Sequence, residues 1–344
     1  MRGTAATVAL IAGVALIAIV VASALPSGGG AFSTRSLAPV SSAPRTATTP
    51  QISSVFDSNI PAKRYGRLIA ALDNGGTNLH GQLVSDLSPV AAAAFATPVA
   101  AYRAYAARWS RRTAVAVTKL RAALADGSRA GAQSAWLRAW VSYLHLGAVY
   151  GLIGPLDHRI DGLPGELGET SFGGLHRIEL GLWSGAPLRS LRPFAASLAS
   201  AVATLPHAIE TAPISPLDYA TRAHEIIEDA QRDFLSGLDV PWSGAGVAAT
   251  AAAVAATDEV VGTLAPLMSG RDNTLIEVKN ELALMRAALG RIRAAHGGSW
   301  PTLSQLTIAQ REQLDATTAG ALSQLQEIPG TLETAQLPQP PRLP

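Results

Sequence analysis

The sequence predicts an all-α protein, and three observations lead to that fold class. Hydrophobic residues make up 48% of the 344 positions, and alanine, the strongest helix former, is conspicuously frequent among them. Aromatic residues account for only 5%, and β-branched residues are sparse, which disfavours sheets. Apolar residues recur at helical spacing, and no segment convincingly predicts a strand. We therefore expect about eight helices, bounded by Ser, Thr, Pro and Gly signals.

The chain begins with a segment typical of exported proteins. Arg2 precedes an uncharged apolar run from Ala5 to Ala24, and Ser27 to Pro61 is rich in Ser, Thr, Pro, Ala and Gly. The first pattern is that of a secretory signal or N-terminal anchor, and the second composition cannot bury a core. We expect the later residues to lie outside the cytoplasm, in the periplasm or at the cell surface. The predicted signal or anchor, flexible tether, helical domain and Pro-rich tail cover residues 1–24, 25–61, 62–335 and 336–344.

Cap residues set the predicted helix boundaries. Thr97-Pro98 is an N-cap and first-turn pair, and Ser128, Ser215 and Thr307 also open helices. The Gly-rich connection 155–172 has the length of a functional or mobile loop. A short helix is expected within 62–87, followed by longer ones at about 97–125, 128–154, 173–183, 193–205, 215–236, 245–268, 273–296 and 307–329.

Charge and cysteine content exclude several classes of function. The formal net charge is only +2, and no Lys/Arg run is interleaved with aromatic residues, so nucleic-acid binding is not indicated. The absence of cysteine removes disulfides, thiolate metal sites and cysteine nucleophiles. Any metal must be held by histidine and oxygen ligands, which suit iron, zinc, manganese or cupric ion.

One candidate half-site for a metal lies in the segment Gly173–Trp183. His176 and Glu179 are three residues apart, so on a helix their Cβ atoms are roughly 5–6 Å apart on one face. An imidazole nitrogen and a carboxylate oxygen at that spacing can reach one cation. A buried, hydrogen-bonded His–Glu pair without metal is the commoner arrangement.

A second pair with similar spacing occurs farther along the chain. His224 and Glu228 are four residues apart, in line with apolar residues such as Ile227, which predicts an inward face. Buried charges need partners, because an unpaired one costs several kcal/mol. Two such helices can converge on a site with two histidines and two carboxylates, as in metal-binding bundles. His145 is the best candidate for an additional ligand.

Sequence motifs give little support for an enzyme. His-x-x-Glu is half of a zinc-hydrolase motif, but His224-Glu225 is followed by Glu228 where His-Glu-x-x-His requires its second histidine. Gly-x-Ser-x-Gly, P-loop and dinucleotide-binding patterns do not occur in the sequence.

Four segments resemble the imelysin-like family, and within it the EfeO/EfeM-type iron-uptake proteins. The likeness keeps the family's order and spacing over roughly Pro98–Gly330, through Ala139–Gly165, Gly173–Trp183, Arg222–Glu228 and Trp300–Leu306. The resemblance implies a pair of four-helix bundles and an extracytoplasmic location. It also implies iron binding for an EfeU-type permease, with an EfeB-type haem peroxidase as co-worker.

The resemblance also assigns roles to particular residues. The family motif Gly-x-His-x-x-Glu maps onto Gly174, His176 and Glu179, while Arg222, His224 and Glu228 match a segment that faces the same cleft. Where the family often has Tyr-Glu-Arg, this chain has Tyr143-Leu144-His145, and one ligand then shifts to His145. The implied metal ligands are therefore His176, Glu179, His224, Glu228 and His145.

The expected function is capture of iron, ferrous or ferric, and its transfer to a membrane permease. Zinc and copper are alternative metals for the same ligand types. Two other functions stay open at this point: an imelysin-like metallopeptidase, and a metal-free helical scaffold or adhesion module.

Overall fold

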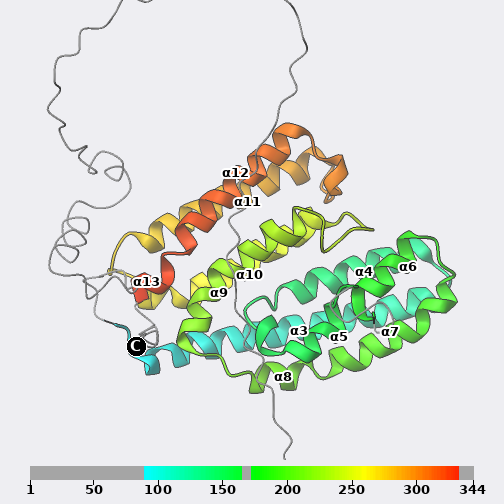
Figure 1. The fold of residues 1–344 in the computed structure, drawn as a ribbon, viewed down its shortest axis with the longest axis horizontal. Helices are drawn as coiled ribbons and strands as arrows, with labels where there is room; N and C mark the ends of the chain where they lie inside the picture. Colours follow the sequence, from blue (N-terminus) through cyan, green and yellow to red (C-terminus); the bar gives the residue numbers. More distant parts are fainter. Residues whose placement is uncertain (1–88, 165–171, 333–344) are drawn as a thin grey trace, which may run out of the picture. The chain divides into compact units, whose positions relative to one another are not determined.

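The computed structural model describes residues 89–164 and 172–332, which are 78% helical and contain no strand (Figure 1). The predicted all-α class is confirmed for these residues. The predicted signal or anchor, the tether, the short helix at 62–87 and the tail at 336–344 lie outside the described residues. Part of the connection 155–172 does as well.

The described residues contain eleven α-helices, joined by short 3₁₀ turns and one π-helical segment, η3, at Ala230–Phe234. The 3₁₀ turns are η1 (Ala92–Phe95), η2 (Tyr150–Leu152) and η4 (Leu303–Gln305). The α-helices are α3 (Ala96–Ala125), α4 (Arg129–Leu144), α5 (Gly154–Asp161), α6 (Gly174–Trp183), α7 (Leu188–Ala203), α8 (Leu205–Thr211), α9 (Pro216–Asp229), α10 (Gly246–Met268), α11 (Thr274–Ala295), α12 (Ile308–Leu325) and α13 (Ile328–Leu332).

Helices α3, α4, α6 and α7 pack against one another and enclose an aromatic interior. Tyr102, Trp136 and Trp140 are fully buried there. The indole Nε1–H of Trp136 donates to the Leu175 carbonyl at 2.8 Å, so its polar atom is satisfied. The core therefore fixes α6, the helix that carries His176 and Glu179, against α4.

Helices α9, α10, α11 and α12 form a second set of neighbours, and α11 and α12 lie side by side in Figure 1. Helix α10 also contacts α3 and α4, so it joins the two sets. By length and composition α10 could span a bilayer, but 67% of its apolar window is buried within the fold. That burial is what a central core helix requires.

Three predicted N-caps are confirmed. Ser128 and Ser215 accept hydrogen bonds from Gly131 N and Asp218 N, and Thr307 forms a capping box with Gln310. These side chains satisfy backbone N–H groups that the first helical turn leaves unpaired. Thr97 is not a cap, because a 3₁₀ turn leads directly into α3 at Ala96.

Two other predicted boundaries are wrong. Helix α7 begins at Leu188 and contains Pro193, which lies on its exposed side, whereas the sequence suggested a start at Pro193. Helix α4 ends at Leu144, not near residue 154, because the fully buried Tyr102 hydroxyl accepts a hydrogen bond from Ala148 N and holds a turn there. The supposed loop after Pro155 begins with helix α5, with that proline in its first turn.

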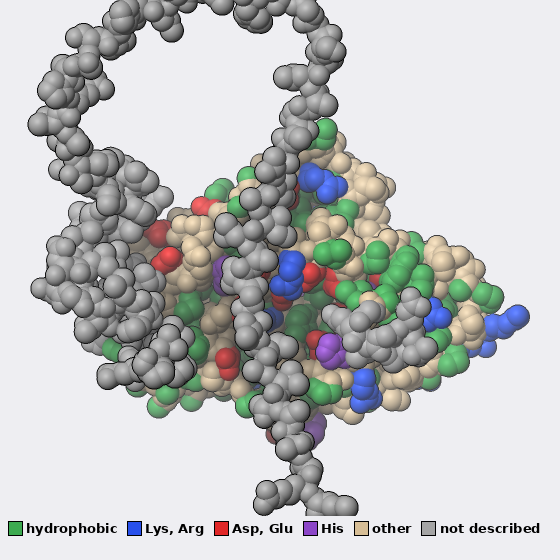
Figure 2. All heavy atoms as spheres, in the orientation of Figure 1, with side chains coloured by type: hydrophobic (Ala, Val, Ile, Leu, Met, Phe, Trp, Pro, Cys, Tyr) green, Lys and Arg blue, Asp and Glu red, His purple; other side chains and the backbone are tan. Residues whose placement is uncertain are grey.

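Charged side chains are unevenly distributed over the surface. On the face drawn in Figure 2, acidic and basic side chains lie close together near the middle, and further basic side chains lie at the right-hand edge.

Candidate metal centre

Three side chains converge at the end of α5, on α6 and just before α10. His176 Nε2 is 3.2 Å from Asp161 Oδ1 and 3.6 Å from Asp239 Oδ1, and one ligand atom of each residue lies within 4.8 Å of the others. Neither Asp161 Oδ1 nor His176 Nε2 has a hydrogen-bond partner in the described part of the chain, although both atoms are buried. Buried polar atoms without partners are rare and need an explanation.

A close contact between α5 and α6 brings two of these residues together. Gly174 opens α6 with φ +65°, and a Cβ placed there would lie 2.4 Å from the Ile160 carbonyl oxygen. Only glycine tolerates both the left-handed backbone and this approach. His176 thereby faces Asp161, the last residue of α5, while Asp239 is positioned by its own N–H donating to Asp233 O at 3.1 Å.

Glu179 fixes the tautomer of His176. Its Oε1 accepts from Ser243 N at 2.8 Å, and its Oε2 lies 3.0 Å from His176 Nδ1. Because a carboxylate accepts hydrogen bonds, we infer that Nδ1 carries the proton and donates it. In the neutral ring, the lone pair of Nε2 then points toward the two aspartates, and in the protonated ring an N–H does. This is the carboxylate–histidine arrangement that orients metal-binding imidazoles.

Three lone-pair atoms that face one another require a positive charge between them. The pKa values of Asp239 and His176 are accordingly raised, which means that both groups hold protons more tightly. Burial raises the pKa of Asp239 to about 8, with Asp161 adding to the effect and His176 opposing it. Burial lowers the pKa of His176, but the charges of Asp161 and Asp239 and the hydrogen bond to Glu179 outweigh it, so the net pKa is well above the ordinary value. A proton or a metal cation would supply the missing charge.

The distances fit a bound cation. Ligand atoms at about 2.1 Å from an ion are about 3.0 Å apart at right angles and about 3.4 Å apart at tetrahedral angles. The observed separations of 3.2 and 3.6 Å need only small adjustments. One imidazole and two carboxylates suit iron, zinc or manganese, and they leave coordination positions open.

The cluster lies at the wall of an acidic pocket of about 270 Å³. Asp161 and Asp239 side chains are 15% and 14% exposed, whereas His176 is fully buried, so an ion can reach the aspartates first. Besides Asp161 and Asp239, three more aspartates line the pocket together with two arginines: Asp157, Asp229, Asp233, Arg222 and Arg232.

The other aspartates of the pocket already have partners. Arg232 pairs with Asp229 at 2.8 Å and with Asp233 at 2.7 Å, and the hydroxyl of Tyr143 donates to Asp157. Within residues 89–164 and 172–332, no arginine or lysine pairs with Asp161 or Asp239. The pocket therefore attracts cations, and no basic side chain among the described residues occupies Asp161 or Asp239.

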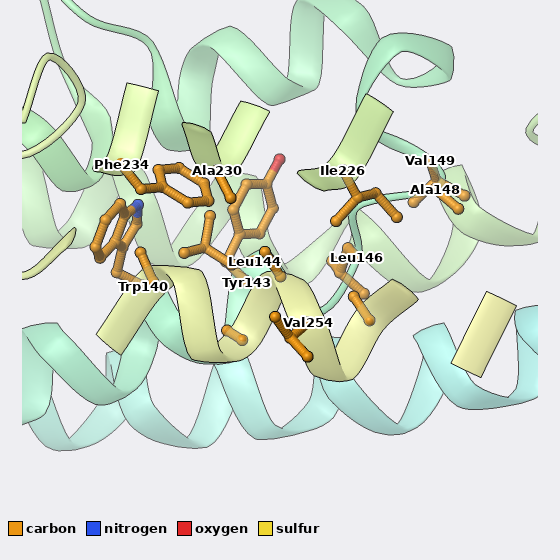
Figure 3. Packing of buried hydrophobic residues seen from close by; sticks show 14 of the residues in the cluster. Trp140, Tyr143, Leu144, Leu146, Ala148, Val149, Ile226, Ala230, Phe234 and Val254 are labelled. Carbon is orange, nitrogen blue, oxygen red and sulfur yellow. The ribbon is translucent and has the colours of Figure 1, made fainter. Parts of the chain in front are cut away.

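A row of aromatic rings supports the imidazole from behind. Ring centroids are 5.2 Å apart for Trp183–Trp136, 5.4 Å for Trp136–Trp140 and 5.9 Å for Trp140–His176. Figure 3 shows Trp140 beside Phe234, with centroids 5.7 Å apart. These contacts restrict the ring of His176 and exclude water from its apolar side.

The structure brings together only two of the five residues predicted as metal ligands, His176 and Glu179. His224 Nδ1 and Glu228 Oε2 are 3.7 Å apart on α9, with side chains 26% and 49% exposed. Among the described residues, neither belongs to a group that can share a cation with His176. The buried face of α9 carries Tyr219, Ala220, Ala223, Ile226 and Ile227, so the pair lies at its edge.

His145 is also separate from the cluster. Its Nδ1 lies 2.6 Å from the Tyr105 hydroxyl, and its ring stacks on Trp109 with centroids 3.4 Å apart. Burial, with a smaller effect of Arg112, lowers the pKa of His145 to about 3, which keeps the ring neutral. Hydrogen bonding and stacking account for this histidine without a metal.

Sequence reasoning missed Asp161 and Asp239 as candidate ligands. Asp161 had a weak signal, since it lies in an acidic connection directly before the His176 segment. Asp239 had none, because its approach depends on how the chain folds back after the π-helical segment η3.

Comparisons with known proteins give no assignment. No family model matches the chain, and a search of curated proteins finds no match.

Proposed function

We propose that this chain is an extracytoplasmic metal-binding protein that captures iron and passes it to a membrane permease. The observation that supports the proposal is the convergence of Asp161, His176 and Asp239, whose facing polar atoms need a proton or a metal cation between them. In this proposal those three residues are the ligands, and Glu179 orients His176. Iron is the cargo, and zinc and copper are the alternatives.

The resemblance to the imelysin-like family supports iron as the metal. The motif Gly174-x-His176-x-x-Glu179 contributes to the cluster, and the two sets of four packed helices agree with a pair of four-helix bundles. By the same resemblance, an EfeU-type permease and an EfeB-type haem peroxidase are the proposed partners. Residues 1–24 are the proposed signal or anchor.

Exchange of the metal follows from the site's chemistry. Binding must displace the protons that His176 and Asp239 hold, and release returns them. Open coordination positions let a donor or acceptor ligand bind the ion during transfer. A structural metal site, by contrast, is normally closed by four protein ligands.

Metal titration tests the proposal. Metal-free full-length protein is titrated with ferrous ion under anaerobic conditions, then with ferric, zinc and cupric ions, by calorimetry and elemental analysis. We expect one ion per chain. The variant Asp161→Asn/Asp239→Asn should not retain it, while the matched variant Glu225→Gln/Glu228→Gln should. Unchanged binding in the first variant would place the metal at other residues, and a parent protein that binds none of the four ions would favour a scaffold function.

A further inference from the structure

A basic groove lies between the exposed faces of α3 and α4. It has a volume of about 510 Å³, within the range of small-molecule sites. Five cationic side chains line it, with two apolar residues and one serine between them: Arg108, Arg111, Arg112, Lys119, Arg138, Val115, Ala116 and Ser142. The groove shares no lining residue with the acidic pocket.

Acidic residues of the described part of the chain do not line this groove. Its lining there contains no aspartate or glutamate, and α3 carries six basic residues and no acidic one. Among the ion pairs of the described residues, none includes any of the five cations. Like charges this close repel one another, and a bound anion would relieve that repulsion.

Aromatic contacts hold two of the arginines in place. The Cζ of Arg112 lies 4.2 Å from the Trp109 ring centroid, and Trp109 stacks on the buried ring of His145. The Cζ of Arg108 lies 5.7 Å from the ring centroid of Tyr105. Guanidinium groups held in this way lose less conformational freedom when they bind an anion.

The wall between the cations is apolar. Val115 is 56% exposed, which is unusual for a large apolar side chain on an otherwise charged helix face, and Ala116 is buried beside it. An inorganic anion would leave this surface in water. A ligand with a charged head and an apolar body would cover both parts.

We propose that this groove binds a phosphate group carried on an apolar body, from a phospholipid headgroup or a soluble phosphate ester. Phosphate offers three oxygens and up to two negative charges to several cations, whereas a carboxylate offers two oxygens and one charge. The site is independent of the metal centre.

Calorimetry with hexyl phosphate tests the proposal on the full-length chain. We expect saturable binding of one molecule per chain, weaker binding of inorganic phosphate, and none of 1-hexanol. The variant Arg111→Gln/Lys119→Gln should bind hexyl phosphate at least tenfold more weakly. The matched variant Arg121→Gln/Lys279→Gln removes the same residue types from exposed positions outside the groove and should bind as the parent does.

Two results would overturn the proposal: equal weakening in both variants, or equal affinity for hexyl phosphate and hexanol. Vesicles distinguish the two sources of phosphate. If the groove variant alone loses retention on phosphatidic acid/phosphatidylcholine vesicles, relative to phosphatidylcholine vesicles, the ligand is a lipid headgroup. If vesicle retention is unchanged while hexyl phosphate binding is lost, the ligand is a soluble ester.

Discussion

The acidic pocket and the basic groove are two charged regions that the fold treats differently. In the pocket, His176 is fully buried and the two aspartates nearly so, and pKa values shift strongly. In the groove, the five cations are exposed. Water screens exposed charges, so their repulsion costs little, whereas buried lone pairs that face one another cannot remain without a proton or a cation. The pocket therefore requires a bound proton or a metal cation, whereas the groove is stable without an anion and only favours one.

The largest expected effect is on the metal affinity of the acidic pocket. His176→Ala should lower affinity for ferrous or zinc ion at least 100-fold, because it removes the only nitrogen ligand of the cluster. His224→Ala is the matched control, and its affinity should change less than twofold. Calorimetric titration of both proteins measures the difference. If the two variants bind equally, the cluster at His176 does not hold the metal.

A second change reverses the imidazole tautomer without removing a ligand. In Glu179→Gln, the amide oxygen can still accept from Ser243 N, which turns the amide NH₂ toward His176 Nδ1. The ring proton then moves to Nε2, and metal affinity should fall about 10- to 100-fold, as for other partners of metal-binding histidines. Glu225→Gln is the control. Equal affinities for parent and Glu179→Gln would mean that Glu179 does not set the tautomer.

The contact that assembles the pocket can be tested with two glycines. In Gly174→Ala, the added Cβ would lie 2.4 Å from the Ile160 carbonyl oxygen, on a residue with φ +65°. In Gly185→Ala, at φ +81°, the added Cβ has no described atom within 4 Å. Backbone strain alone should lower the free energy of unfolding by about 1 kcal/mol in Gly185→Ala. In Gly174→Ala the clash adds to the strain, and the free energy of unfolding should fall by about 2–3 kcal/mol. Urea unfolding gives both values. Equal losses would show that α5 and α6 separate without cost.

The stabilisation of the fold by bound metal should depend on pH, which tests the raised pKa values in the pocket. Asp239 and His176 have raised pKa values, so the metal-free fold holds protons that the unfolded chain releases, and its stability falls as pH rises toward 8. Metal replaces those protons, so its affinity rises with pH. Excess zinc should raise the melting temperature more at pH 8 than at pH 6. The free energy by which zinc stabilises the fold should be greater at pH 8 by about 1 kcal/mol or more. Asp239→Asn should reduce this dependence, and a pH-independent increase would contradict the argument.

The smallest effect concerns the groove. Arg111→Gln should stabilise the ligand-free fold by less than about 0.5 kcal/mol, because it relieves repulsion that solvent already screens. Arg121→Gln, on the same helix outside the groove, should change the free energy of unfolding even less. Thermal unfolding at low salt measures both. A marked destabilisation in Arg111→Gln would mean that the side chain supports the packing of α3.

The fold class and several helix ends could be predicted from the sequence, because alanine content, apolar spacing and caps such as Ser128 and Thr307 act locally. It also identified His176 and Glu179 as one unit, since both are on a single helix. It could not reveal Asp239, which reaches His176 only through tertiary folding. For His224 and Glu228, helical spacing shows that two residues share a face, but not which other helix that face meets, so it could not show their separation from the cluster at His176.

Tryptophan fluorescence can report on the site, because a row of aromatic rings ends at His176. Trp183, Trp136 and Trp140 lie in sequence with ring centroids 5.2 and 5.4 Å apart, and Trp140 touches the imidazole. Excitation absorbed by any of these indoles can migrate along the row to Trp140, where a paramagnetic iron or cupric ion on His176 quenches the emission. Diamagnetic zinc should leave it far brighter. Tryptophan emission would thus distinguish a paramagnetic from a diamagnetic ion bound at His176.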